Sequence, residues 1–205
     1  PLMESVKGAL RIDSIVTDVG STKAAICAGM SQLLDGGGPY FIGSHPMAGS
    51  QLGGMENARP DLFDGAACMI TPNELALDRA TDLLTQLWES LGMKVSRTSP
   101  ERHDLIVAHL SHLPHLLAST LCSYLDTQET GWKELAGPGL RDTTRVAAGD
   151  AELWRQILET NRTEVLKAID GFSRELSGLQ SALEKSNSED LLAILQKGRA
   201  FREEL

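Results

Sequence analysis

The chain is short of cysteine, of positive charge and of long apolar runs, and each shortage excludes a class of protein. Its three cysteines, Cys27, Cys68 and Cys122, lie far apart and form no CxxC pair, so we expect neither a disulfide framework nor a thiolate zinc site. The net charge of -9 argues against a nucleic acid or an anionic membrane as partner. No apolar run reaches the roughly 18 residues of a membrane span, and no signal peptide is visible. These absences predict a cytoplasmic protein of the reducing interior.

The first half of the chain alternates strand-like and helix-like segments. Strand-like segments lie at 11–20, 39–45, 65–72 and 93–99, and helix-like segments lie at 21–34 and 73–92. Ser21 is expected to cap the first of these helices, and Gly92 to end the second. Strands that alternate with helices predict βαβ units and a largely parallel sheet with right-handed crossovers.

The second half of the chain reads as helical throughout. A long apolar helix is expected over 101–125, kinked by Pro114, followed by about ten turns of continuous helix over 150–186 and a final helix from Ser188. The boundary therefore divides an α/β domain, residues 1–98, from an all-helical domain, residues 99–205. Helices with apolar faces on two sides predict a homodimer formed through the second domain.

Ligands of open α/β sheets bind at the carboxyl ends of the strands, and two segments of this sequence lie there. The first is DVGSTK (18–23), in which the hydroxyl of Ser21 suits both a helix cap and a ligand contact. The second is GSHPMAGS (43–50), which places the isolated His45 at a strand end before glycines that leave room for a substrate. An imidazole there either accepts a proton from an alcohol or serves as a hydrogen-bonded structural residue.

Two familiar site patterns are excluded by spacing. The sequence holds no GxGxxG, and its GSTK lacks the order of a phosphate-binding loop. The other four histidines, His103, His109, His112 and His115, lie on one helix, where each step of three rotates the side chain by about 60°. They fan out instead of converging, so we expect no metal site. Some of them should cap or pack, while one or two face a polar pocket.

Two arginines follow a Gly/Pro turn in GPGLRDTTR (137–145). Either Arg141 or Arg145 reaches back to clamp a carboxylate, or this stretch is a solvated helix start capped by Asp142. The residues alone do not decide between the two interpretations.

Taken together, these motifs resemble the prephenate/arogenate dehydrogenase family, the oxidoreductases of tyrosine biosynthesis. The matching stretches are DVGSTK (18–23), GSHPMAGS (43–50) with Gly53, Gly54, Leu62 and Phe63, MITP (69–72), HD (103–104), SHLPH (111–115) and GLRDTTRVAAGDAELW (139–154). The resemblance covers residues 11 to about 170 and implies the rear part of a Rossmann-like nucleotide-binding domain followed by a helical dimerisation domain. Family members carry GxGxxG ahead of the point where this sequence begins, so we expect a truncated chain that lacks the main pyrophosphate loop for NAD or NADP.

The resemblance also implies roles for residues of this sequence. The reaction is the oxidative decarboxylation of prephenate to 4-hydroxyphenylpyruvate, or its arogenate equivalent, with tyrosine as a candidate inhibitor. His45 and Ser21 are assigned to catalysis, and Gly20 and Ser21 to the cofactor. Substrate binding is assigned to Arg145, Arg141, His112, His115, Ser50 and Gln51. Gln51 departs from the family, because many relatives have an acidic residue there, and this leaves the choice between prephenate and arogenate open.

Two alternatives belong to other classes. One is a non-catalytic remnant that keeps dimerisation and the aromatic-acid pocket without the cofactor site. The other is a metal-dependent hydrolase built on the histidine helix, which would require stoichiometric metal in the purified protein.

Overall fold

The computed structural model describes residues 2–34, 39–49, 54–72 and 78–205. Its sheet has four strands in the order β1-β2-β3-β4. The strands are β1 (Ile15–Val16), β2 (Tyr40–Pro46), β3 (Ala67–Pro72) and β4 (Lys94–Arg97). The pairs β1–β2 and β3–β4 are parallel, whereas β2 and β3 are antiparallel over Ile42↔Pro72 to Pro46↔Cys68. The prediction of a largely parallel sheet was therefore wrong at its centre.

The reason lies in how the strands are connected. A helix joins each parallel pair: α2 (Ala24–Leu34) connects β1 to β2, and α3 (Asp78–Ser90) connects β3 to β4. The described part of the β2–β3 connection has only the 3-10 turn Met55–Asn57 and no α-helix. A return without a crossover produces an antiparallel neighbour.

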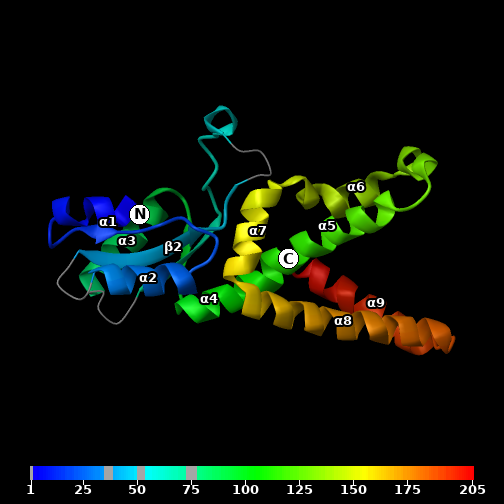
Figure 1. The fold of residues 1–205 in the computed structure, drawn as a ribbon. Coiled ribbons are helices and arrows are strands. Elements are labelled where there is room, and N and C mark those ends of the chain that lie inside the picture. Colours follow the sequence, from blue (N-terminus) through cyan, green and yellow to red (C-terminus); the bar gives the residue numbers. More distant parts are fainter. Residues whose placement is uncertain (1, 35–38, 50–53, 73–77) are drawn as a thin grey trace.

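Both faces of the sheet are covered by helices, as Figure 1 shows. Neighbouring residues of a strand point to opposite faces. Phe41 packs with Cys27 and Leu34 of α2, while the next residue, Ile42, packs in a cluster with Trp88 of α3. This two-sided burial explains the nearly continuous apolar run of β2 and fixes the strand that carries His45.

Helix α2 begins later than the sequence predicts. Its first residue is Ala24, so Ser21 lies three residues ahead of the helix and does not cap it. The backbone N–H groups of Lys23 and Ala24 instead donate to the two carboxylate oxygens of Asp104, at 2.7 and 3.0 Å. The cap therefore comes from the second domain, and its sequence separation of about 80 residues hid it from local pattern reading.

The expected kinked helix over 101–125 is present as three pieces. They are α4 (Pro100–Val107), a π-helical turn (Ala108–His112) and α5 (Leu113–Asp126). Ser99 caps α4 by accepting from the N–H of Arg102. Pro114 lies in the first turn of α5, directly after the π turn, which is where a proline disturbs the preceding hydrogen bonds.

By length and composition, the run Pro100–Asp126 is long and apolar enough to cross a membrane, with a mean hydropathy of 1.3, where the sequence analysis found no such run. His103, Asp104, His112 and His115 of this run are nevertheless buried inside the protein. Buried ionisable groups of this kind fit a core helix that lines an internal site.

The expected ten-turn helix over 150–186 is broken. It consists of α7 (Ala151–Thr160) and α8 (Arg162–Glu184), separated by Asn161 with φ -103° and ψ 27°. The chain then forms α9 (Ser188–Glu203). Helix α6 (Pro138–Thr144) begins after Gly137, so the exposed Asp142 lies within it and does not cap it.

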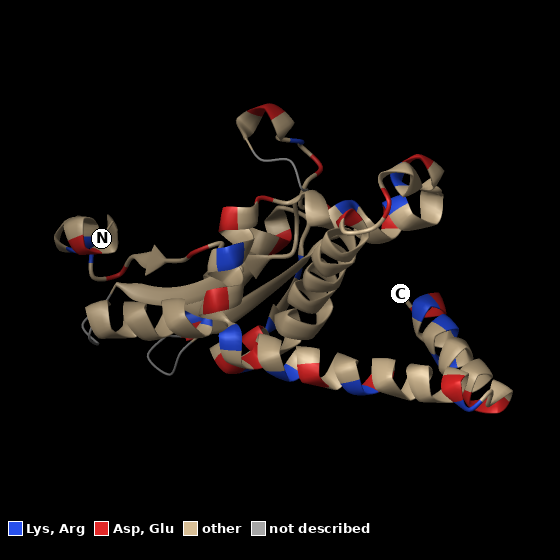
Figure 2. Ribbon diagram, turned by 45° about the vertical axis from the view of Figure 1, so that its right-hand side comes forward, with Lys and Arg blue, Asp and Glu red and all other residues tan. Residues whose placement is uncertain are grey.

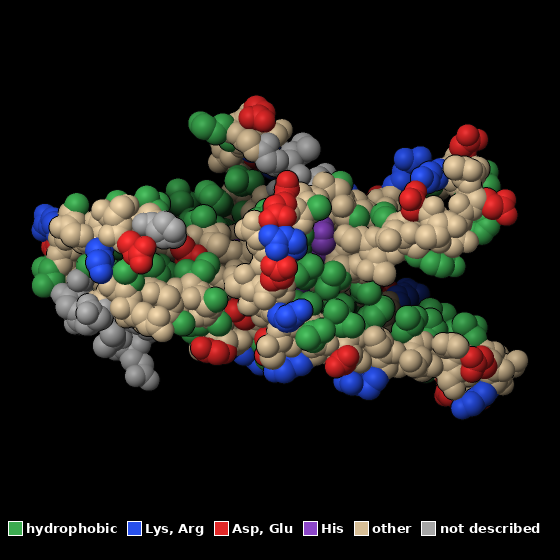
Figure 3. All heavy atoms as spheres, viewed as in Figure 1, with side chains coloured by type: hydrophobic (Ala, Val, Ile, Leu, Met, Phe, Trp, Pro, Cys, Tyr) green, Lys and Arg blue, Asp and Glu red, His purple; other side chains and the backbone are tan. Residues whose placement is uncertain are grey.

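The helical part forms two arms that spread away from the sheet (Figure 1). Helices α5 and α6 make one arm, and α8 and α9 the other, with α7 close to the sheet. Helix α5 has no Lys, Arg, Asp or Glu before its last residue, Asp126, and its ribbon is accordingly tan in Figure 2. Figure 3 shows hydrophobic side chains gathered where the arms meet and along their facing sides.

Candidate active site

His45 lies at the carboxyl end of β2, on the wall of a cavity of about 480 Å³. The cavity lies where the sheet meets the helical arms, and its wall comes from both parts of the chain. The sheet side contributes Ser21, His45, Pro46, Met47, Ala48 and Gly49, and the helical side contributes Ser111, His112, His115, Arg145, Val146, Gly149, Leu153, Trp154 and Ile157. Its volume suits a small organic substrate.

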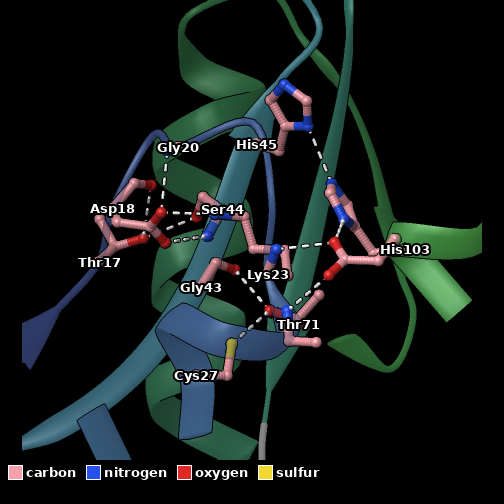
Figure 4. A network of polar contacts seen from close by, with 12 residues as sticks. Thr17, Asp18, Gly20, Lys23, Cys27, Gly43, Ser44, His45, Thr71 and His103 are labelled. Atoms are coloured by element: carbon pink, nitrogen blue, oxygen red, sulfur yellow. Dashed lines mark hydrogen bonds and ion pairs between the residues drawn. The ribbon is translucent and has the colours of Figure 1, made fainter. Parts of the chain in front are cut away.

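The loop that carries Ser21 is tied to β2 by one carboxylate. Asp18 Oδ2 accepts from the N–H of Gly20 at 2.9 Å and from the buried ammonium of Lys23, and Asp18 Oδ1 accepts from the N–H of Ser44 at 3.1 Å (Figure 4). Ser44 is the residue before His45. These bonds explain why the DVGSTK loop lies beside the strand end and brings Ser21 to the cavity.

The ring of His45 continues into a chain of buried polar contacts. Its Nδ1 lies 2.9 Å from Nε2 of His103, and Nδ1 of His103 lies 2.8 Å from Oδ1 of Asp104. Figure 4 shows the other nitrogen of His45 directed away from His103. Burial, together with neighbouring basic groups of which His103 is the strongest, lowers the pKa of His45 to about 3. His45 is therefore neutral at pH 7 and has a lone pair for a proton.

Asp104 is held as a carboxylate. Burial alone would raise its pKa, but hydrogen bonds from His103 and from the N–H groups of Lys23 and Ala24 outweigh burial and lower it. The N-terminus of α2 adds its partial positive charge to these bonds.

Two histidines face the cavity from the opposite wall. Burial lowers the pKa of His112 to about 4 and also lowers that of His115. Nε2 of His112 and Nδ1 of His115 are buried and have no hydrogen-bond partner among the described residues. The ring of His115 stacks on Trp154 with 3.5 Å between centroids and 10° between planes. Buried nitrogens on a cavity wall are normally satisfied by a ligand or by water.

Asn161, the residue that separates α7 from α8, orients one of these rings. Its Nδ2 donates to the backbone carbonyl of Asp104 at 2.8 Å and contacts Nδ1 of His112 at 3.2 Å. Because Nδ2 is a donor in both contacts, Nδ1 of His112 must accept. A neutral His112 then has its proton on Nε2, the buried nitrogen that has no partner among the described residues.

The sequence-predicted site residues are only partly brought together. Ser21, His45, His112, His115 and Arg145 line one cavity. Arg141 is exposed on α6, and neither Arg141 nor Gly20 is among the residues of that wall. Ser50 and Gln51 lie outside the described residues. Of the remaining histidines of the helical run, His103 contacts His45 and His109 is exposed, and the described residues contain no His, Cys, Asp or Glu cluster that could hold a metal.

Sequence reasoning missed the roles of His103, Asp104, Asn161 and Trp154. The HD and AELW motifs contain three of these residues, but a motif does not say which partner a side chain will meet. Trp154 lies one helical turn after Asp150, the N-cap of α7. This spacing was the local signal for the side of the helix on which the indole lies.

A sheet of the Rossmann-like type whose strand ends are closed by helices, with a neutral histidine in the cavity between them, places this chain among Rossmann-like α/β proteins that continue into a helical part. Two family models match the chain: "Prephenate dehydrogenase, nucleotide-binding domain" over residues 1–97 and "Prephenate dehydrogenase, dimerization domain" over residues 99–197. The chain belongs to the prephenate/arogenate dehydrogenase family.

Individual relatives agree with this assignment. The chain is 30% identical to the prephenate dehydrogenase of Bacillus subtilis over 207 residues, covering 100% of this chain and 56% of the relative. Among solved structures, Synechocystis arogenate dehydrogenase has a TM-score of 0.86 and 32% identity, with 100% of this chain and 74% of that chain covered. Prephenate dehydrogenase from A. aeolicus, in complex with hydroxyphenyl propionate and NAD+, has a TM-score of 0.91 and 31% identity, with 99% and 71% covered. The chain spans about half the length of the first curated relatives it matches.

Proposed function

We propose that this chain forms the substrate site of an NAD- or NADP-dependent dehydrogenase that converts prephenate, or arogenate, with loss of CO2. With prephenate the product is 4-hydroxyphenylpyruvate, and we propose that the reaction belongs to tyrosine biosynthesis in the cytoplasm. The observation that carries the proposal is one cavity lined by a neutral, buried histidine from the sheet and by Arg145 from the helical domain. The names and folds of the relatives support the same chemistry.

The substrate carries a ring hydroxyl and a ring carboxylate, and the cavity offers a group for each. Neutral His45 accepts the hydroxyl proton as the carbinol is oxidised. The guanidinium of Arg145 binds a carboxylate, a pairing whose charge and fork geometry favour tight, oriented contacts. His112 lines the same cavity as a further polar contact for the substrate, and the His115–Trp154 stack offers a flat wall for the ring. Ser50 and Gln51 stay predicted substrate contacts.

A nicotinamide dinucleotide supplies the acceptance of hydride when it is bound. The residues of this chain fit its nicotinamide end, because Ser21 and His45 line the cavity at the carboxyl ends of β1 and β2. Gly20, the other residue that the resemblance assigns to the cofactor, precedes Ser21 in the same loop. The 205 residues contain no GxGxxG, so no residue of this sequence is assigned to the pyrophosphate.

We also propose that the helical domain forms a homodimer. Large apolar side chains recur at helical spacing on one face of α8 and are exposed: Leu166, Ile169, Phe172, Leu176 and Leu183. Val165 lies on the same face, one heptad before Phe172, and is buried against the rest of the chain, so this face is covered near the start of α8 and exposed further along. An exposed apolar stripe of this kind indicates a further partner. Tyrosine, which shares a ring and a carboxylate with the substrate, is proposed to compete for the cavity.

The test is turnover by the full-length protein with prephenate or arogenate, each against NAD+ and NADP+, followed by absorbance of the reduced dinucleotide. His45→Asn should lower kcat by about 10²- to 10⁴-fold, the usual contribution of a general base. Arg145→Ala should raise KM by about 10- to 100-fold, the equivalent of one lost charge-assisted hydrogen bond.

Arg141→Ala is the matched control, because Arg141 lies one helical turn before Arg145, is exposed and is not on the cavity wall. It should leave both constants within about threefold of the parent. Normal turnover by His45→Asn would contradict the assigned base. A full-length protein that binds the aromatic acid but never reduces either dinucleotide would support the non-catalytic remnant instead.

A further inference from the structure

Hydrogen-bonding rules limit which ring nitrogens carry protons in the contact between His45 and the second domain. An ionised carboxylate only accepts, so Nδ1 of His103, 2.8 Å from Oδ1 of Asp104, carries a proton. In the arrangement with no proton on Nε2 of His103, that atom accepts from Nδ1 of His45, 2.9 Å away. Nε2 of His45 is then left without a proton.

We propose that His103 is a positioning residue that, backed by Asp104, holds His45 in the Nδ1–H tautomer and stabilises the imidazolium that forms when Nε2 accepts the substrate proton. In that step the O–H bond of the substrate breaks and an Nε2–H bond forms. The Nδ1 proton stays between the two rings, and no second proton needs to move. This inference rests on the proposed function for its catalytic part, and for the tautomer on the geometry together with an Nε2 of His103 that carries no proton.

The surroundings of His45 explain why such support is needed. The charged and titratable groups that act on it are His103 and Asp104 from α4, Lys23 from the loop before α2, and His112 from the π turn. Burial and the basic neighbours disfavour its protonated form, whereas Asp104 favours it. A buried base with a low pKa is a poor proton acceptor unless the charge it gains meets a negative group, and His103 connects it to the only such group among those named.

The two residues behind His45, His103 and Asp104, are held firmly in place. His103 and Asp104 are almost fully buried, at 0% and 3% exposure, and lie in the first turns of a helix capped by Ser99. The other oxygen of Asp104 accepts from Ala24, and its first also accepts from Lys23. Three donors therefore hold the carboxylate: the N–H groups of Lys23 and Ala24 and the Nδ1–H of His103. The ring of His103 has little freedom to turn as a result.

The direct test is nitrogen NMR of the protein labelled with 15N at histidine, in which N–H and bare ring nitrogens give separate signals. The His45 signals are assigned by their loss in His45→Asn. We expect N–H character at Nδ1 and a bare Nε2 at neutral pH in the parent protein. His103→Gln keeps an acceptor, its side-chain oxygen, near the position of Nε2 and should preserve this tautomer. His103→Leu removes the acceptor and should release His45 to the other tautomer.

Kinetics of the full-length variants separate positioning from folding. His103→Leu should lower kcat by about 10²- to 10³-fold with KM within about threefold, because the base has the wrong tautomer. His103→Gln should lie within about tenfold of the parent in kcat. His109→Leu, on the same helical run but exposed, is the control and should behave as the parent.

Two results overturn the proposal: an Nε2–H tautomer of His45 in the parent protein, or a folded His103→Leu that keeps kcat within about threefold. If His103→Leu does not fold, the parent spectrum and His103→Gln decide the question. Absence of turnover with either substrate would refute the proposed function, while the NMR result on the tautomer would stand on its own.

Discussion

Mild acid should destabilise this protein, because burial holds His45 and His112 in the neutral form and also lowers the pKa of His115. His45 and His112 have pKa values lowered from 6.5 to about 3 and about 4, with burial as the largest cause in both. In the unfolded chain each takes up a proton as the pH falls below 6.5. The folded state does not, so the stability that these residues contribute is fully present above pH 6.5 and is lost toward their folded pKa values.

The magnitude follows from the size of that window. A pH of about 5 is about 1.5 units below the pKa of 6.5 that each histidine has in the unfolded chain. Protonation of the unfolded chain therefore lowers the free energy of unfolding by about 2 kcal/mol per residue and about 4 kcal/mol for both. This is a large fraction of the stability of an ordinary domain, about 5–15 kcal/mol. The assay is equilibrium unfolding in urea, followed by circular dichroism, at about pH 7 and about pH 5.

Substitution identifies the source of the loss. His112→Gln should remove about 2 kcal/mol of this loss, since it removes one of the histidines whose pKa burial lowers. His109→Gln, at an exposed position of the same helical run, should retain all of it. A free energy of unfolding that changes by less than about 1 kcal/mol between the two pH values would refute the reasoning, because it would mean that neither histidine is buried in neutral form.

Two further predictions concern the cavity wall and the dimer. A Cβ at Gly149 would meet Nε1 of Trp154 at 2.7 Å, so Gly149→Ala should displace the indole and weaken binding of an aromatic acid about tenfold by calorimetry. Gly139→Ala, where nothing lies within 4 Å, should not, and equal effects of the two would count against the assigned wall. Leu176→Glu, on the exposed stripe of α8, should shift the protein from dimer to monomer in sedimentation equilibrium, and an unchanged mass would show that the stripe is not the interface.

Features of the fold that depend on neighbouring residues could be predicted from patterns in the sequence. The alternation of strands and helices, the change to an all-helical texture near residue 100 and the disturbance at Pro114 are all local signals, and the structure has each of them. His45 was identified because a polar residue at a strand end is unusual in a sequence window. Arg145 followed from a motif, and the structure places it on the same cavity wall.

The features that the sequence hid are those made by distant partners. The helical periodicity of the sequence over 150–186 runs through Asn161 without a break. The helix is nevertheless interrupted there, where Asn161 contacts Asp104 and His112. Ser21 had the right residue type for a cap, but a carboxylate from the other domain took that role. The antiparallel pairing of β2 and β3 depends on a loop whose path no pattern encodes. Tertiary contacts, and not local preference, decided each of these cases.

The capping of α2 by Asp104 has a mechanical consequence for the whole molecule. A helix that is capped from its own chain neighbours keeps its first turn whatever the adjacent domain does. Here the first turn of α2 and the seam between the two domains share one carboxylate, so parting the domains also uncaps the helix and removes two of the three donors that hold the carboxylate. Hinge opening and fraying of α2 are thus one cooperative event, and the two domains behave at this seam as a single folding unit.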